Sequence, residues 1–131
     1  MAFSVPNEGE TRMLTKITVN DISLRLFNAD ITPAESDVAA TYTGDEPASA
    51  GYAAITLTGG SWTVATNSGE STAEYAAQTF TFTSGPETIY GYFLLDTGSG
   101  ELLLAESFTT GSVSVPGGGG DIEITPIINL A

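Results

Sequence analysis

The sequence predicts an all-β fold, a single-domain antiparallel β-sandwich or jelly roll of about eight strands that follows a short N-terminal arm or helix. Three observations predict it. Short apolar runs recur along the chain between turns rich in Gly, Pro, Asn and Asp. Several runs alternate apolar with polar residues, which is the period of a half-buried strand. The most hydrophobic segment, residues 87–108, has the pattern of two strands joined by a tight turn. A closed barrel is the alternative architecture.

Composition excludes most kinds of chemistry. The chain has 131 residues, the length of one domain, and contains no Cys and no His. Most nucleophile–base pairs, zinc sites and histidine acid–base schemes need one of these residues, so we expect a non-enzymatic protein with no cofactor and no metal site. No apolar run approaches the roughly 20 residues of a membrane span, and no basic-then-apolar export signal opens the chain. We therefore expect no membrane partner and no signal peptide.

Charge is distributed unevenly. There are 3 basic and 16 acidic residues, a formal net charge of -13, and no cation follows Arg25. Nucleic-acid binding depends on Lys and Arg, so we expect no nucleic-acid partner. Two explanations of the asymmetry stay open: an acidic surface that keeps the protein soluble, or a near-neutral segment, residues 1–21, that docks on a partner while residues 22–131 form the β domain. The second explanation predicts these docking residues: Arg12, Met13, Leu14, Lys16 and Ile17.

The first elements are predicted as follows. Residues 10–17 have helical spacing, with acids first and cations last, although a strand that continues to residue 19 is the competing prediction. Residues 22–28 predict a strand with Ile22, Leu24 and Leu26 inward and Phe27 outward. Residues 29–37 predict a loop, and residues 38–43 a weak strand.

The later strands are predicted from the same alternation. Threonine and phenylalanine alternate most clearly near residues 79–83, which is typical of a half-exposed strand. Pro126 cannot donate to a ladder, so the last strand should lie at an edge or bulge there. The predicted strands are residues 52–58, 61–66, 73–84, 112–115 and 121–130.

The central hairpin of residues 87–108 has a distinctive first arm. Tyr90, Tyr92 and Leu94 share one face, while the opposite face is also apolar. Such a strand needs cover on both sides, from a second sheet or from another copy of the chain. We therefore predict an oligomer interface that includes Phe27, Tyr90, Tyr92 and Leu94. Residues 96–100 form the turn.

Three groups of polar or aromatic residues are candidate sites with a simpler structural explanation. Residues 96–101 superficially resemble a calcium loop but lack the required acids, which favours a hairpin turn. Acids of two loops could gather around a cation, although solvated loop charge is favoured: Asp30, Glu35, Asp37, Asp45 and Glu46. Four aromatic residues could form a sugar-stacking face, although packing in a core or interface is favoured: Tyr52, Trp62, Tyr90 and Tyr92.

Several segments together resemble small β-rich virion proteins of tailed bacteriophages, including capsid cement or decoration proteins. They are VPNEGE (residues 5–10), LRLFNADITPAESD (24–37), GYAAITL (51–57), SWTV (61–64), YGYF (90–93) and ELLLAESF (101–108). The resemblance implies a non-enzymatic protein, often a homotrimer, that binds the major capsid protein on the head surface and reinforces the shell. The implied location is the virion, after synthesis in the host cytoplasm. The family has no catalytic motif, so no functional residue is carried over.

Two other functions are compatible with the sequence. One is a receptor- or glycan-binding module of a phage tail or head fibre, which would use the aromatic strands and acidic loops. The other is an acidic extracellular or halophilic domain with no role in a virion, in which salt screens the self-repelling charge.

Overall fold

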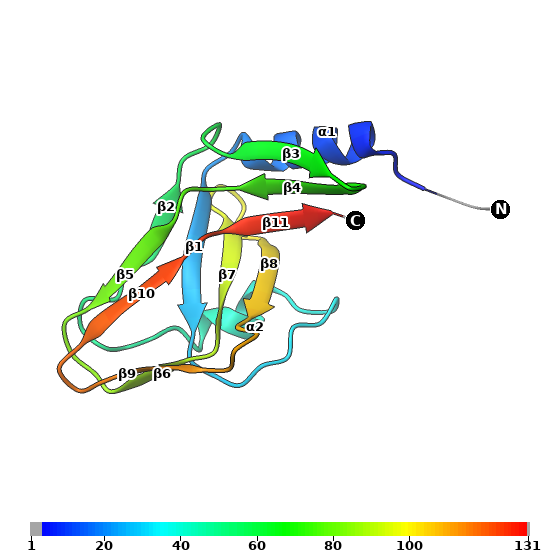
Figure 1. Ribbon diagram of the computed structural model, residues 1–131. Coiled ribbons are helices and arrows are strands. Elements are labelled where there is room, and N and C mark those ends of the chain that lie inside the picture. Colours follow the sequence, from blue (N-terminus) through cyan, green and yellow to red (C-terminus); the bar gives the residue numbers. More distant parts are fainter. Residues whose placement is uncertain (1–3, 131) are drawn as a thin grey trace.

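The computed structural model describes residues 4–130, and within them it contains two helices and eleven strands (Figure 1). The predicted all-β sandwich with a short N-terminal helix is confirmed. The helices are α1 (Asn7–Thr18) and α2 (Ala39–Thr43). The strands are β1 (Ile22–Phe27), β2 (Ile55–Leu57), β3 (Thr63–Asn67), β4 (Glu70–Glu74), β5 (Gln78–Phe82), β6 (Glu87–Ile89), β7 (Gly91–Asp96), β8 (Leu102–Ser107), β9 (Val113–Val115), β10 (Gly120–Ile124) and β11 (Ile127–Leu130).

All strand pairs are antiparallel and form four sheets. The central sheet has the order β2-β1-β7-β8, so β1 and β7 lie inside it and β2 and β8 form its edges. A three-stranded sheet has the order β11-β4-β3, and two further pairs are β10-β5 and β6-β9. The β3–β4 hairpin turns through Ser68 and Gly69, both with positive φ, which is the geometry of a type I′ turn.

Three predicted strands are each broken into two, which explains why the structure has more strands than predicted. The predicted strand 73–84 becomes β4 and β5, and the predicted strand 121–130 becomes β10 and β11. The chain bends between β4 and β5 and also between β10 and β11. The two bends lie side by side, because the Tyr75 amide of the first donates to the Pro126 carbonyl of the second at 3.0 Å. The expected irregularity at Pro126 is therefore observed. The first arm of the central hairpin also breaks, because β6 pairs with β9 while β7 pairs with β1 and β8.

The main core lies between the central sheet and the bent strand pairs. Leu24, Leu26 and Leu94 from the central sheet pack there with Phe80, Ile122 and other apolar residues of the facing strands. Apolar side chains at alternate positions of each strand point to this layer, as the period of a strand requires.

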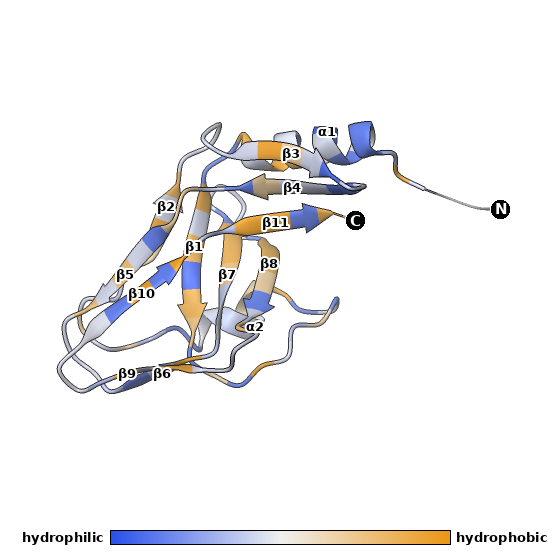
Figure 2. Ribbon diagram, in the orientation of Figure 1, coloured by the Kyte–Doolittle hydropathy of each residue, from blue (hydrophilic) through white to orange (hydrophobic). Residues whose placement is uncertain are grey.

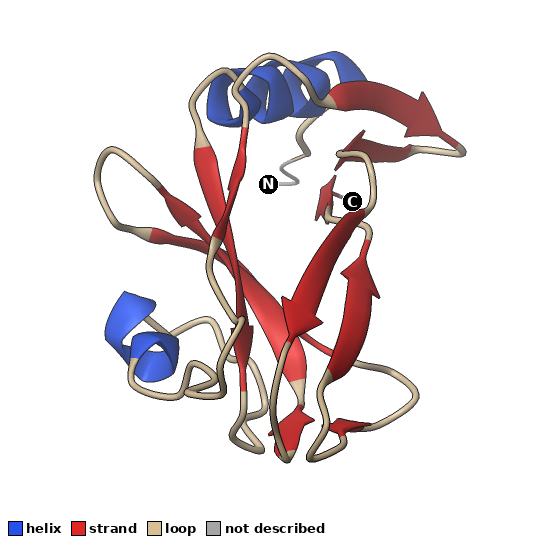
Figure 3. Cartoon of the chain, turned by 90° about the vertical axis from the view of Figure 1, so that its left-hand side faces the viewer, coloured by secondary structure: helices blue, strands red, loops and turns tan. Residues whose placement is uncertain are grey.

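A second, smaller core lies on the other face of the central sheet. It contains Phe27, Phe93 and Leu95 from the sheet and Tyr42 from α2. Figure 3 shows α2 and its loop on one side of the central sheet and the bent strand pairs on the other. The sheet is therefore covered on both faces by its own chain.

Residues 38–43 were predicted as a weak strand, and this prediction is wrong. The segment forms the short helix α2, in which the Val38 amide donates to the Thr41 hydroxyl at 3.1 Å. Tyr42 is fully buried, and its ring centroid lies 5.0 Å from that of Phe27 and 5.4 Å from that of Phe93. The tertiary packing of Tyr42 outweighs the weak strand preference of the small residues around it.

The predicted N-terminal helix is observed and is longer than expected, since α1 begins at Asn7 directly after Pro6. Proline is tolerated at a helix start because its missing amide hydrogen is not needed there. Leu14 is fully buried in the main core, and the helix lies along β3 and β4 (Figure 1). Residues 1–21 are thus not a free arm over the part that the structure describes.

Candidate interaction surfaces

Arg25 is occupied by a structural network. Its guanidinium pairs with the Glu46 carboxylate at 3.0 Å and donates to the Ser23 hydroxyl at 3.0 Å. The Tyr52 hydroxyl donates to the same carboxylate at 2.8 Å and accepts from the Leu26 amide at 3.1 Å. This network ties the loop after α2 to β1 and pairs the Arg25 charge within the chain.

Glu87 holds a second structural network. Its carboxylate accepts hydrogen bonds from the Asn28 amide group at 3.0 Å and from the Ser49 hydroxyl at 2.7 Å. Burial alone would raise the pKa of Glu87, but the hydrogen bonds from Ser49 and Asn28 hold it below its usual range. Glu87 therefore joins the end of β1, the loop before β2 and the start of β6.

This lowered pKa predicts a pH dependence of stability. Because the folded protein binds the Glu87 proton more weakly than the unfolded chain, the stabilisation is complete above the usual pKa of 4.5 and is lost as the pH falls through the folded value. A Glu87→Gln variant should unfold with about 1 kcal/mol less free energy near neutral pH, after allowance for solvent exposure. Urea titrations at several pH values should show this difference shrinking below pH 4.

An exposed-site variant, Glu8→Gln, removes the same formal charge from α1 and is the control for net charge. A difference between the wild type and Glu87→Gln that stayed constant down to about pH 3 would contradict the assignment.

The acidic loops do not form a cation site. No group of three or more His, Cys, Asp or Glu residues is placed to hold a metal ion within residues 4–130. The Asp37 carboxylate instead accepts from the Tyr42 hydroxyl at 2.7 Å and from the Ala34 amide at 2.9 Å, and both bonds lower its pKa. Asp96 accepts from the Gly98 and Ser99 amides at 2.9 Å each, which is the turn predicted for residues 96–100.

The aromatic residues do not form an exposed platform. Trp62 is 8% exposed and packs edge-on against Tyr75, with ring centroids 5.3 Å apart. The Tyr52 ring stacks against Phe80 and Phe82 in the main core. Packing in the core is therefore confirmed for Trp62 and Tyr52, and a sugar-stacking face cannot be built from these rings.

The predicted oligomer interface is wrong for three of its four residues. Phe27 and Leu94 are fully buried and Tyr92 is 5% exposed, all within this single chain. The Tyr92 hydroxyl donates to the Glu106 carboxylate across β7 and β8 at 2.7 Å. Tyr90 is half-buried and packs against the smaller core. The prediction failed because the chain covers both faces itself: the facing strands of the main core cover Tyr92 and Leu94, and Tyr42 of α2 covers Phe27.

The predicted docking residues divide between the inside and the outside of the molecule. Leu14 and most of Ile17 face the main core, so these two residues are corrected to core positions. Arg12, Met13 and Lys16 are exposed, and Met13 has 48% of its surface accessible. Val19, just after the helix, is 60% exposed. We call this exposed set, Arg12, Met13, Lys16 and Val19, the α1 face.

The open edge of β8 is a second surface, which sequence reasoning missed. Within residues 4–130, β8 pairs with β7 alone. Its leucines are half-buried although the strand lies at the edge of a sheet, and Figure 2 shows the hydrophobic colouring of β7 continuing onto β8. The available signal was the run Leu102, Leu103 and Leu104, which is more hydrophobic than a solvent-facing edge needs to be.

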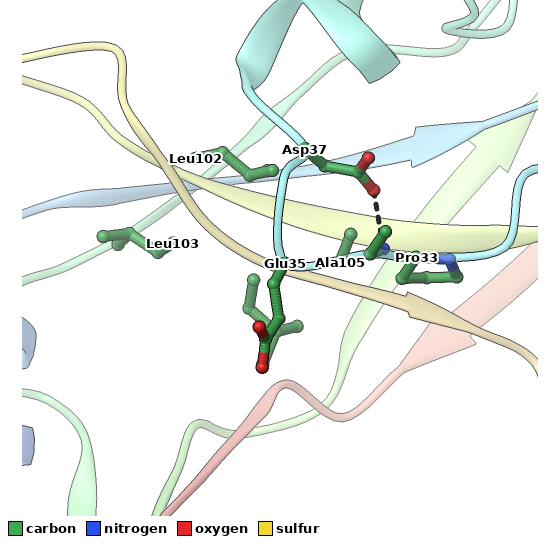
Figure 4. Close-up of a pocket in the computed structure, with 8 residues that line it drawn as sticks. Pro33, Glu35, Asp37, Leu102, Leu103 and Ala105 are labelled. Carbon is green, nitrogen blue, oxygen red and sulfur yellow. Dashed lines mark hydrogen bonds between the residues drawn. The ribbon is translucent and has the colours of Figure 1, made fainter.

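Two hollows flank this edge. The loop-side hollow, about 360 Å³, lies between β8 and the loop before α2, with Pro33, Glu35 and Asp37 on the loop side (Figure 4). The corner-side hollow, about 650 Å³, lies between β8 and the bend that joins β10 to β11. Leu104 and Ala105 border both hollows.

Comparison of the chain with protein-family models, with curated proteins and with solved structures finds no significant match. Among the described residues, neither helix has the length and apolar character needed to cross a membrane.

Proposed function

We propose that this protein is a non-enzymatic virion structural protein of the capsid decoration type, which binds the major capsid protein at the outer surface of a bacteriophage head. The sequence resemblance supports this proposal, and so does the use of the polar side chains described above in structural networks. The proposal includes the homotrimer that the resemblance implies, held by contacts other than the buried residues Phe27, Tyr92 and Leu94.

The observation that carries the proposal is the α1 face. Arg12 and Lys16 lie on it beside the exposed Met13, whereas Arg25, the only other Lys or Arg of the chain, is paired with Glu46. Glu8 lies one turn before Arg12 on the same side of α1, so this surface carries two cations, one acid and two apolar residues. On an otherwise acidic molecule it fits a shell surface that presents carboxylates around an apolar patch. Electrostatic complementarity would also orient the acidic body away from the shell.

Co-sedimentation with heads of the virus that encodes the chain tests the proposal. The wild type should sediment with the heads, and an Arg12→Gln/Lys16→Gln variant should lose at least about tenfold in affinity at low salt, because two attractive charges are removed. The matched control is Thr110→Glu/Ser112→Glu, which changes net charge equally at exposed residues of the loop between β8 and β9. This control should bind heads as the wild type does.

Equal binding by the wild type and the Arg12→Gln/Lys16→Gln variant would exclude the α1 face as the docking surface. Failure of the wild type to bind heads at all would overturn the capsid assignment. Light scattering on the free protein measures whether it forms the implied homotrimer.

A further inference from the structure

The edge of β8 is open on a sheet whose other edge, β2, is short. β8 extends over Leu102–Ser107, whereas β2 covers only Ile55–Leu57. Natural proteins usually protect a long edge strand with β-bulges, with charges that point inward, with proline, or with a covering segment. β8 has one register irregularity, where Leu102 and Leu104 pair with Leu95 and Leu94, and it is otherwise regularly paired with β7. Here residues 102–105 carry three leucines and an alanine, and no residue between 4 and 130 pairs with them on their outer side.

The two hollows match the geometry of an added strand. Side chains of a strand alternate between the two faces of a sheet. A strand added beside β8 would therefore direct alternate side chains into the loop-side hollow and into the corner-side hollow. Because Leu104 and Ala105 border both hollows, the two lie on either side of the same stretch of β8.

The charges around the β8 edge favour a basic segment as the added strand. The loop-side hollow is bordered by Glu35 and Asp37, and the corner-side hollow by Glu106 and Glu123, while neither hollow has a Lys or Arg in its lining. Asp37 and Glu106 accept hydrogen bonds from Tyr42 and Tyr92, which fixes their carboxylates at these positions. A second copy of this chain, with a formal net charge of -13, would meet like charge here.

We propose that the β8 edge binds an extended, basic segment of another protein by strand addition. Main-chain hydrogen bonds to β8 supply affinity, as in other complexes formed by strand addition. Apolar side chains of the segment enter the two hollows, and its Lys or Arg residues pair with the surrounding carboxylates. This surface is separate from the α1 face and goes beyond the proposed docking on the head.

Selection from a displayed library of random peptides, each about a dozen residues long, on the full immobilised chain tests the proposal. Enriched peptides should alternate apolar with other residues, carry Lys or Arg, and lack proline at their centre. When one of them is added to the isotopically labelled protein, the largest amide shifts in the NMR spectrum should fall in residues 102–107 and along both hollows.

Two further measurements separate strand addition from non-specific attraction. A copy of the enriched peptide with alternate backbone amides methylated should bind at least about tenfold more weakly, because the ladder hydrogen bonds are removed. A Glu106→Gln/Glu123→Gln variant should weaken binding by a similar factor at low salt, and glutamine at position 106 can still accept from Tyr92. The matched control, Glu8→Gln/Asp121→Asn, removes two charges from residues that line neither hollow and should bind normally.

Absence of enrichment, equal binding by the methylated peptide, or shifts centred away from β8 would each overturn the proposal. So would a dimer of the free protein that protects residues 102–107, because the edge would then belong to a second copy. The Arg12→Gln/Lys16→Gln variant should bind the peptide normally, so failure of this proposal is distinguishable from failure of the capsid assignment.

Discussion

A Gly91→Ala variant is expected to lose about 3 kcal/mol or more of the free energy of unfolding, the upper range for overpacking. A methyl group added at Gly91 would lie 2.0 Å from the Glu106 carbonyl oxygen and 2.6 Å from Cζ of Phe27. The first contact is with the backbone of the paired strand β8, so it cannot be relieved by a rotamer change. To relieve both contacts, β7 must separate locally from β8 and the Phe27 ring must shift within the smaller core.

Urea unfolding followed by the fluorescence of Trp62 measures this loss, since the indole is buried in the folded protein. The matched control is Gly44→Ala, where an added methyl group meets nothing within 4 Å and the backbone has φ -76 and ψ -13. That change should be neutral or stabilising by about 0.5 kcal/mol. If Gly91→Ala does not fold in soluble form while Gly44→Ala does, the clash is also supported; equal midpoints for the two variants would refute it.

A Tyr42→Ala variant is expected to cost about 3–5 kcal/mol, as truncation of a large buried aromatic residue usually does. Tyr42 is the residue of α2 that fills the space above Phe27 and Phe93, and it is fully buried. Its loss should open one face of the central sheet to water. Tyr42→Phe keeps the ring and removes only the hydrogen bond to Asp37, so it should cost much less.

Chemical unfolding at two protein concentrations about a hundredfold apart distinguishes self-cover from cover by another copy. The present structure predicts the same wild-type midpoint at both concentrations as far as this face is concerned, because the cover is intramolecular. A small effect of Tyr42→Ala, combined with an unfolding midpoint that rises with protein concentration, would indicate that the Phe27 and Phe93 face is an oligomer interface.

The strands show where sequence patterns suffice and where they do not. Alternation identified β1 and β5, continuous hydrophobicity indicated β7, and turn-forming residues placed the hairpin turn at residues 96–100, because these signals depend on neighbouring residues. The break between β4 and β5 has no local signal of comparable strength. It is formed where the Tyr75 amide donates to the carbonyl of Pro126, which lies 51 positions later in the bend between β10 and β11.

The interaction surfaces show the same division. The helical spacing of residues 10–17 predicted α1, but it did not separate the exposed Arg12, Met13 and Lys16 from Leu14 and Ile17, which the fold turns toward the main core. The hollows beside β8 involve residues 33–37, 102–106 and 123–129, which only the folded chain brings together. No spacing rule along one sequence predicts such a juxtaposition.

By itself, the sequence determined an acidic, β-rich domain without Cys or His, with its cations near the N-terminus and with one strand, β7, that needed apolar cover on both faces. Only the tertiary structure decided what provides that cover. The pattern of a strand shows that one of its faces must be kept from water. Any apolar surface, of the same chain or of another, satisfies this requirement. Here Tyr42 of α2 packs against Phe27 and Phe93, and the facing strands pack against Leu24 and Leu94, so the same chain provides the cover on both faces.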